Sequence, residues 1–429
     1  MVLVVLAASA AAMMMLVAHV HITETEWRAA SDDSGRTAGV KHYIRRPDDD
    51  GNLTFTPVNN KYIKTLPNVC IVKKPNGKMI KIEAGNWASE KDIVVYRAKS
   101  NKRTTFKVLG KRTVFTTWTV NFTTKNIPSD FNIVSYPAYF VSPYQTGNLY
   151  HFIHDLTVGV FGVMNDTNRL NSYEPNQVLF QRPLSGRYDN PYRYKEILRA
   201  LSVREDYHVF HGILSGTCYP FGVFGVKTVS RKEIALYLTK QFEEIYPTKC
   251  NNEFVVNLLQ RKTRQILNAK ELLAALKQNG YTNSNIITFE NTDFEHQWRT
   301  IRCTNILIGV QGAGLQWAMF LRPASGMLEL IYEKWPVRYG PEYKDFDLSV
   351  GVLKASETHY DWDYISKQYL NGKPLTDEMK KTALNHKTFR KIHPDLWSLD
   401  GFKWANAAYD AEAFVEQVKK LHKAMNKQD

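Results

Sequence analysis

Two arginines in the second half of the chain occupy positions where they could bind phosphate groups. Arg261 and Arg264 lie between an apolar run, residues 254–259, and a segment with helical spacing, residues 268–278. Both guanidinium groups would then lie where a strand ends and a helix begins. Arginine offers paired donors for phosphate oxygens, and the helix dipole adds positive potential there. The pattern favours a diphosphate site, and a solvated basic loop is the simpler alternative.

A small-residue turn forms a second candidate. Residues 309–315 read Gly-Val-Gln-Gly-Ala-Gly-Leu, and Gly312 and Gly314 would let a ligand approach outward-pointing backbone amides. Such turns also occur where a helix packs closely on a strand, so the turn alone is weak evidence. Glu329 lies in the next apolar run, where a buried carboxylate needs a partner such as an arginine or a ribose hydroxyl.

The elements that would position these residues alternate between strand and helix patterns. Short apolar runs bounded by polar residues are typical of strands buried on both faces, and the segments between them have helical spacing. We expect strands at residues 254–259, 286–289, 306–310 and 327–331, and helices at residues 268–278, 294–302 and 314–321. Right-handed crossovers would make a doubly wound sheet, which binds ligands outside the carboxyl ends of its strands.

A third candidate lies upstream, where Asn148 precedes His151, His154 and Asp155. On a helix these last three side chains share one face, so the carboxylate can orient an imidazole. A histidine or aspartate in such a cluster can take a proton from an attacking hydroxyl as a general base. The alternatives are histidines satisfied in the core, and a metal site for which no fourth ligand is obvious.

Together these motifs resemble glycosyltransferase family 61, which includes plant β-1,2-xylosyltransferases and animal O-linked N-acetylglucosaminyltransferases. The matching residues are Asn148, His151 and Asp155; Arg261, Arg264, Ile266, Asn268, Glu271 and Leu272; Phe294 and Gln297; Gly312, Ala313, Gly314 and Leu315; and Phe320, Leu321, Pro323, Glu329 and Leu330. The His-x-x-His-Asp form resembles members that add β-1,4-linked N-acetylglucosamine to protein O-mannose. Gln311 stands where the family usually has His, which removes a titratable side chain.

The resemblance implies an α/β, GT-B-like fold with two Rossmann-like domains facing a cleft. It also implies inverting transfer of a sugar, with UDP-N-acetylglucosamine as the expected donor, to a glycan or glycoprotein acceptor. Its catalytic residues would be His151, His154 and Asp155, and its donor-binding residues would be Arg261, Arg264, Asn268, Gln311, Gly312, Ala313, Gly314, Leu315 and Glu329. The alternatives are a xylosyltransferase of the same family and, because of Gln311, a non-catalytic protein that binds a nucleotide sugar or glycan.

No metal ligand is assigned at this site. The pairs Asp345 with Asp347 and Asp361 with Asp363 both spell Asp-x-Asp, but both follow the last predicted strand of the nucleotide unit. A hard cation needs converging oxygen ligands, which a short string does not guarantee. Two arginines and a helix dipole could neutralise a leaving diphosphate instead, and a requirement for Mn²⁺ or Mg²⁺ stays open.

Composition excludes a disordered chain and gives little support for nucleic-acid binding. The 429 residues are 44% hydrophobic and 12% aromatic, enough for a large core and two or three domains. The net charge is +14, and residues 97–112 form the densest basic patch of the N-terminal part. No RNA-binding motif, zinc spacing or basic helix with interleaved aromatics accompanies the charge. Binding of an acidic donor substrate therefore explains the positive charge better than binding of nucleic acid.

We predict four segments along the chain. Residues 1–22 are a signal anchor or signal peptide, and residues 23–230 form an acceptor-side domain with strands and hairpins followed by an α/β region. Residues 231–350 form the Rossmann-like domain that binds the nucleotide sugar. Residues 351–429 form an extension whose amphipathic helix, residues 411–425, packs back on the first half.

Several weaker features agree with the lumen of the Golgi or endoplasmic reticulum. The apolar run of residues 2–20 suits a single-pass type II anchor, with a cleaved signal and a secreted protein as the alternative. Four cysteines permit two disulfides in three pairings, and Asn-x-Ser/Thr sites occur in three places. These residues are Cys70, Cys218, Cys250 and Cys303, and Asn52, Asn121 and Asn165.

Overall fold

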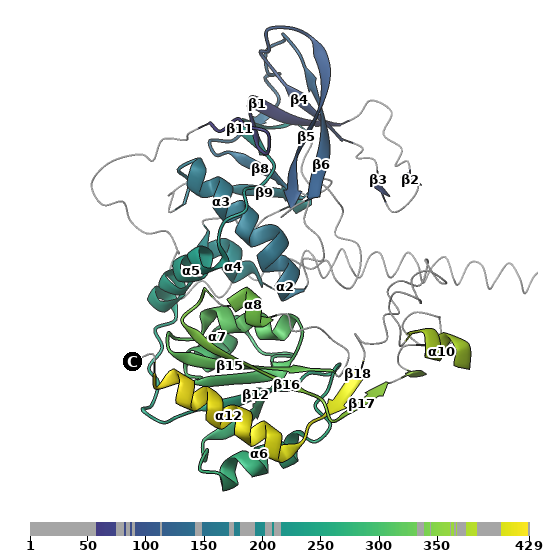
Figure 1. The fold of residues 1–429 in the computed structure, drawn as a ribbon. Coiled ribbons are helices and arrows are strands. Elements are labelled where there is room, and N and C mark those ends of the chain that lie inside the picture. Colours follow the sequence, from purple (N-terminus) through teal and green to yellow (C-terminus); the bar gives the residue numbers. More distant parts are fainter. Residues whose placement is uncertain are drawn as a thin grey trace, which may run out of the picture. The chain divides into compact units, whose positions relative to one another are not determined.

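A five-stranded parallel sheet, in the order β13-β12-β14-β15-β16, forms the second half of the fold (Figure 1). The computed structural model describes residues 57–73, 81–82, 86–87, 91–111, 114–141, 148–170, 176–180, 194–201, 208–209, 216–332, 339–343, 345–360, 362–363, 366, 375–383 and 405–427.

The predicted strands and helices of this sheet are confirmed, with ends that differ by a few residues. The strands are β12 (Val256–Leu259), β13 (Ser284–Ile287), β14 (Ile306–Val310), β15 (Ser325–Ile331) and β16 (Leu348–Lys354). They are connected by α6 (Ala269–Gln278), α7 (Phe294–Arg302), the 3-10 helix η5 (Ala313–Phe320) and α8 (Tyr339–Tyr343). All residues of β14 and β15 are buried, which explains why their sequences are mostly apolar, with Glu329 of β15 as a buried exception.

The boundary predicted at residue 350 is wrong, because it falls inside β16. This fifth strand pairs in parallel with β15 along its whole length. Its sequence, Leu-Ser-Val-Gly-Val-Leu-Lys, lacks the unbroken apolar character of the inner strands. An edge strand has one partner strand and is partly exposed, so its sequence need not be a continuous apolar run.

The strand order places a topological switch point between β12 and β14. Numbered along the chain, the order is 2-1-3-4-5, so the connections run to opposite sides of the sheet from these two neighbours. In such sheets the loops after the two strands diverge and leave a crevice at their carboxyl ends, where ligands bind. Those two loops carry the predicted arginines and the glycine turn.

A nine-stranded mixed sheet forms the first half, in the order β10-β9-β8-β11-β1-β4-β6-β5, with β7 beside β11. Its strands are β1 (Lys64–Lys73), β4 (Lys91–Val95), β5 (Lys102–Lys111), β6 (Val114–Phe122), β7 (Asn132–Ile133), β8 (Ala138–Val141), β9 (Gln177–Phe180), β10 (His208–Val209) and β11 (Thr217–Phe224). Strands β8, β9, β10 and β11 are parallel, whereas β1 is antiparallel to both of its neighbours. Both halves therefore contain parallel strands, which confirms the α/β class.

A continuous helical segment follows β8 and carries the predicted histidines. It consists of α2 (Leu149–His151), the π-helix η2 (Phe152–Thr157) and α3 (Val158–Asp166). The side chain of Asn148 caps its start by accepting from the amide of Tyr150 at 3.0 Å. A π-helical turn inside a helix is rare and often marks a functional site.

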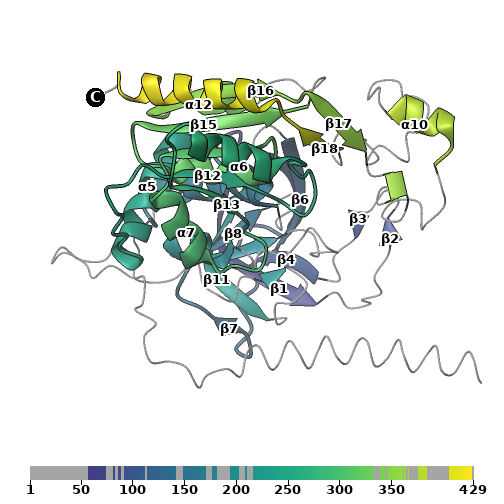
Figure 2. The same ribbon diagram turned by 90° about the horizontal axis from the view of Figure 1, so that it is seen from below.

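The C-terminal helix α12 (Ala411–Met425) packs on the second sheet, against β15, β16 and α6 (Figures 1 and 2). Its buried apolar residues belong to the same cluster as those of β12 and β14. The prediction that this helix packs back on the first half is therefore wrong. Gly326 and Gly351 explain the choice of surface, because their missing side chains leave room for Met425 and Leu421.

Helix α5 (Arg231–Ile245) connects the two sheets within one buried core. Its residues Ile234, Leu238 and Phe242 share a cluster with Phe152 of the first half and Trp298 of the second. Residues 44–429 form one compact unit, so the domain boundary at residue 230 stays a prediction.

Both disulfides are present, in one of the three pairings that the sequence permits. Cys70 and Cys218 are opposite each other on the neighbouring strands β1 and β11. Cys250 and Cys303 join the segment after α5 to the end of α7.

The predicted leader, residues 1–22, and the sequon at Asn52 lie outside the described residues. The sequon residue Asn165 is exposed, and Asn121 is half-buried. None of the described helices has the length and apolar content that a membrane span requires.

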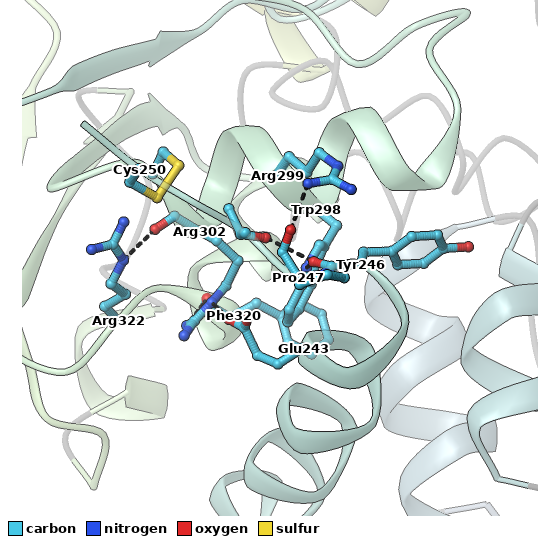
Figure 3. A network of polar contacts seen from close by, with 11 residues as sticks. Glu243, Tyr246, Pro247, Cys250, Trp298, Arg299, Arg302, Phe320 and Arg322 are labelled. Carbon is cyan, nitrogen blue, oxygen red and sulfur yellow. Dashed lines mark hydrogen bonds and ion pairs between the residues drawn. A yellow bond between two sulfur atoms is a disulfide. The ribbon is translucent and has the colours of Figure 1, made fainter. Parts of the chain in front are cut away.

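A polar network surrounds the second disulfide and fixes the position of α7 (Figure 3). Arg302 donates from Nε to Glu243 of α5 at 2.6 Å and from Nη1 to the carbonyl of Phe320 at 2.9 Å. Arg322 donates to the carbonyl of Arg302 at 2.6 Å. Helix α7 is therefore tied to α5, to η5 and, through Cys303, to Cys250.

We predict that replacing Cys250 and Cys303 together by serine lowers the free energy of unfolding by about 2–4 kcal/mol, because the disulfide restricts the unfolded chain. Denaturant unfolding of the two proteins measures the difference. Reduction of the wild-type protein should give a loss at least as large, since it also opens the bond between Cys70 and Cys218. Equal stability of the serine variant and the wild-type protein would contradict the pairing.

Candidate functional site

The loop after β12 is closed by one glutamine and presents both predicted arginines. Gln260 donates from Nε2 to the carbonyl of Ile266 at 3.1 Å, and the amide of Ile266 donates to its Oε1 at 2.9 Å. These two bonds connect the ends of a short loop that contains Arg261 and Arg264. The ends of the loop are thus held in a fixed conformation.

Arg264 crosses from this loop to the glycine turn after β14. Its backbone is in the left-handed region, with φ of 59°, which is uncommon for a residue with a side chain. Its Nη1 donates to the carbonyl of Gln311 at 2.9 Å. Strained backbone of this kind persists only where the surroundings impose it, and it occurs often at ligand sites.

Arg261 is a half-buried cation beside a second cation. Its Nη1 atom and the Nε atom of Arg264 are buried and have no hydrogen-bond partner among the described residues. Burial and the neighbouring Arg264 guanidinium lower the pKa of Arg261 to about 10, while Glu290 acts in the opposite direction. Arg261 is therefore still charged at neutral pH, and within the described ranges no carboxylate forms an ion pair with it.

The absence of a side chain at Gly312 leaves room for the guanidinium groups of Arg261 and Arg264. A Cβ atom at Gly312 would collide with Nη1 of Arg261 and would lie 2.7 Å from Nη1 of Arg264. At Gly314 a Cβ would meet only a methyl group of Leu259 at 2.9 Å and the aliphatic part of Arg261 at 3.8 Å. The predicted role of the turn, close approach of other groups to its backbone, is visible here as contact with the arginines themselves.

A buried carboxylate supports the turn from below. Glu329 on β15 is fully buried and accepts from Nε2 of Gln311 at 2.5 Å and from the amide of Tyr339 at 3.0 Å. The hydroxyl of Tyr339 in turn donates to the carbonyl of Gly312 at 2.7 Å. Glu329 is out of reach of a ligand, so we infer that it positions Gln311 and Tyr339. The sequence pattern gave no signal for Tyr339, because it lies outside the predicted strand and helix unit.

Two further residues predicted to bind the donor are used inside the fold. Asn268 donates to the carbonyl of Tyr409 at 2.7 Å and accepts from its amide at 3.1 Å, which joins the start of α6 to the end of β18 (Ala405–Ala408). Leu315 is fully buried and packs over Gly309. The residues that the structure brings together after β12 and β14 are Arg261, Arg264, Gln311, Gly312, Ala313 and Gly314.

His151 and Asp155 form a hydrogen-bonded pair in the first half. Nδ1 of His151 lies 2.8 Å from Oδ2 of Asp155, and the two side chains are 28% and 13% exposed. When the carboxylate of Asp155 accepts a hydrogen bond from Nδ1–H of His151, the basic lone pair of the neutral imidazole lies on Nε2. His154 is buried, and its ring centroid lies 4.1 Å from that of Tyr150. The structure therefore separates the two histidines, one paired and partly exposed, the other packed.

Tyr150 connects this pair to the glycine turn. Its hydroxyl donates to Glu342 of α8 at 3.2 Å, and its ring centroid lies 6.4 Å from that of Tyr339. Arg231 also donates to Glu342, at 2.8 Å. Helix α2 contacts η5 directly, so the histidine pair and the arginine pair belong to one region of the protein.

The first Asp-x-Asp string follows α8 in the sequence, and the second is only partly described. Oδ1 of Asp347 lies 3.6 Å from Nζ of Lys232, and Asp347 is largely exposed. Asp361 is outside the described residues. Within the described ranges, no cluster of three or more histidine, cysteine, aspartate or glutamate residues is arranged to hold a metal ion.

The protein belongs to the α/β class, with a parallel sheet that carries paired arginines at its switch point and a histidine–carboxylate pair in the same region. Residues 149–328 match the sequence profile of Glycosyltransferase 61. The match includes His151 and Asp155, both arginines and the glycine turn, and it ends just before Glu329.

Two relatives cover parts of the chain. An EGF domain-specific O-linked N-acetylglucosamine transferase of Drosophila melanogaster is 29% identical over 153 residues, which are 31% of this chain and 29% of the relative. A protein O-linked-mannose β-1,4-N-acetylglucosaminyltransferase 2 of Tetraodon nigroviridis is 26% identical over 136 residues, 31% of this chain and 23% of the relative. The chain thus spans less than a third of either relative.

Among solved structures, a family 9 glycosyl transferase from Veillonella parvula matches with a TM-score of 0.28 and 8% identity, over 71% of this chain and all of that one.

We predict that Gly312→Ala weakens binding of pyrophosphate at least tenfold, because the added methyl group displaces both guanidinium groups. Gly314→Ala is the matched control in the same turn, since its methyl group meets only a flexible leucine. Titration calorimetry with pyrophosphate compares the two variants. Equal affinities would show that the arginines do not bind the anion from their observed positions.

Proposed function

We propose that this chain transfers N-acetylglucosamine from UDP-N-acetylglucosamine to a hydroxyl group of a glycan or glycoprotein, with inversion at the anomeric carbon. The observation that carries the proposal is the pair of partly buried guanidinium groups over Gly312, at the switch point of a parallel sheet. The match to the Glycosyltransferase 61 profile supports sugar transfer, and the names of both relatives support N-acetylglucosamine as the sugar.

The two arginines would neutralise the leaving diphosphate. When the bond between the anomeric carbon and the diphosphate oxygen breaks, negative charge develops on that oxygen. Arg261 and Arg264 are already in place and already desolvated, so they stabilise this charge without reorganising. Preorganised cations in a site with little water have a much larger effect than the same cations in solution. A contribution from Mn²⁺ or Mg²⁺ is a separate question, which addition of EDTA tests.

His151 would be the general base. Its Nε2 takes the proton of the acceptor hydroxyl while the hydroxyl oxygen forms the new bond to the anomeric carbon. Asp155 holds the imidazole in the required tautomer and stabilises the imidazolium that forms. His154, packed against Tyr150, would help to hold Tyr150 in its contacts with Glu342 and Tyr339.

Gln311 does not disturb the turn. Its carbonyl accepts from Arg264 and its side chain donates to the buried Glu329, so an amide satisfies the position without a titratable group. We therefore propose that activity is retained despite the departure from the family pattern. A chain that binds UDP-sugars but transfers none would instead be a binding protein.

We further propose that the protein works in the lumen of the secretory pathway. Two disulfides join segments far apart in the sequence, and such bonds persist in oxidising compartments. The proposal includes a type II anchor at residues 1–22. These residues lie outside the described part of the chain.

We predict that Arg261→Met abolishes the increase in melting temperature that UDP or UDP-N-acetylglucosamine causes in the wild-type protein. In the absence of nucleotide the variant should be more stable than wild type by about 0.5–2 kcal/mol, because it removes a half-buried charge whose Nη1 atom has no hydrogen-bond partner among the described residues. Thermal unfolding with a panel of nucleotides, with and without Mn²⁺ and EDTA, measures both effects.

Arg299→Met is the matched control for this experiment, since Arg299 is a more exposed arginine of α7 that pairs with Glu295. It should leave the nucleotide response unchanged. If no nucleotide raises the melting temperature of the wild-type protein, the proposed donor site is wrong.

We predict that His151→Ala lowers the rate of sugar transfer by about 10²–10⁴ and leaves UDP binding unchanged, because the base acts on the acceptor and not on the donor. His359→Ala is the matched control, since His359 pairs with Glu357 at 3.1 Å on the surface. Transfer of radiolabelled sugar to a glycoprotein mixture measures the rate. A His151→Ala variant with wild-type activity would remove His151 from the mechanism.

A further inference from the structure

A polar pocket lies at the amino ends of the strands of the second sheet, whereas the arginine pair lies at their carboxyl ends. The cavity has a volume of about 360 Å³, and its lining includes Asn252, Asn305 and Ser325 at the amino ends of the strands. The arginine pair follows the carboxyl end of β12. Four or five residues of strand separate these edges, which corresponds to about 13–17 Å. The pocket is therefore a second site, distinct from the proposed donor site.

The walls of this pocket are held by covalent and hydrogen bonds. Cys303 lines it and is joined to Cys250, which fixes the segment that contains Asn252. Oδ1 of Asn305 accepts from the amide of Val255 at 2.8 Å. The pocket is thus formed by rigid ends of the sheet and needs no rearrangement to accept a ligand of the size that such cavities bind.

The other side of the pocket is aromatic and comes partly from α12. The rings of Phe254 and His422 stack, with centroids 4.1 Å apart and an angle of 24° between their planes. Asn426, the exposed C-cap of α12, adds an amide at the rim. Packing of α12 on the second sheet is what brings these residues to the amino ends of the strands.

The lining chemistry fits a neutral ligand with many hydroxyl groups. Three exposed amides, from Asn251, Asn252 and Asn426, offer both donors and acceptors. Charge is nearly balanced, with Glu253 as the acid and Arg322 as the arginine. A polyanion would need several cations, whereas neighbouring sugar hydroxyls match amide and guanidinium groups, and the apolar face of a sugar ring matches the aromatic pair.

We propose that this pocket binds a neutral hexose or N-acetylhexosamine unit of a glycan, independently of the donor site. Occupation of the pocket would hold a glycosylated partner on the protein while the crevice at the other edge of the sheet carries out its own reaction. The proposal does not depend on the nature of that reaction.

Saturation-transfer NMR with the full chain tests the proposal, with the methyl glycosides of glucose, mannose and N-acetylglucosamine as probes. We expect transfer to at least one glycoside in the wild-type protein. Asn426→Trp should reduce the signal at least fivefold, because a large side chain at the rim fills the pocket. Asn279→Trp is the matched control, since Asn279 is the exposed C-cap of α6 and does not line the pocket.

Arg261→Met separates this site from the donor site, and it should leave saturation transfer unchanged even though it abolishes the response to UDP. No transfer to any of the three glycosides would overturn the proposal. So would a signal that Arg261→Met abolishes and Asn426→Trp preserves, because it would place the sugar at the donor site. Neither result affects the test of UDP binding, so the two proposals fail separately.

Discussion

The site depends on holding two positive charges close together beside the backbone of Gly312, with no carboxylate in an ion pair with either charge among the described residues. Arg261 and Arg264 repel each other, and burial makes the repulsion stronger than it would be in water. The fold overcomes this cost with local bonds: Gln260 closes the loop, and the carbonyl of Gln311 accepts from Arg264. In the proposed function a diphosphate would offset this repulsion, so the cost of holding the two cations together would favour its binding.

The glycine turn must be equally rigid, because the arginines rest against Gly312. Its rigidity comes from the interior, through the bonds of the buried Glu329 to Gln311 and Tyr339, and the bond of Tyr339 to Gly312. Tyr150, next to His151, packs near Tyr339. One connected set of contacts thus supports both the cationic region and the histidine pair, so the proposed leaving-group and base functions share a common framework.

Much of the second half could be predicted because its signals are local. Strands buried on both faces are mostly apolar, which made β12, β14 and β15 recognisable from sequence alone despite Asn257 and Glu329. Spacing along a helix placed His151 and Asp155 on one face, and the structure pairs them. The edge strand β16 was not recognised, because partial exposure lets polar residues and glycine enter its sequence.

The sequence by itself determined the α/β class, the order of strands and helices, and the positions of the two arginines and the glycine turn at the ends of strands. These follow from periodicity and chain order, which each segment carries independently. Only the tertiary structure decided that Glu329 and Asn268 bond inside the fold, that Tyr339 reaches Gly312, and that α12 covers the second sheet. Those facts depend on which distant residues meet, and an amphipathic helix or a buried carboxylate shows that a partner is needed without showing which one.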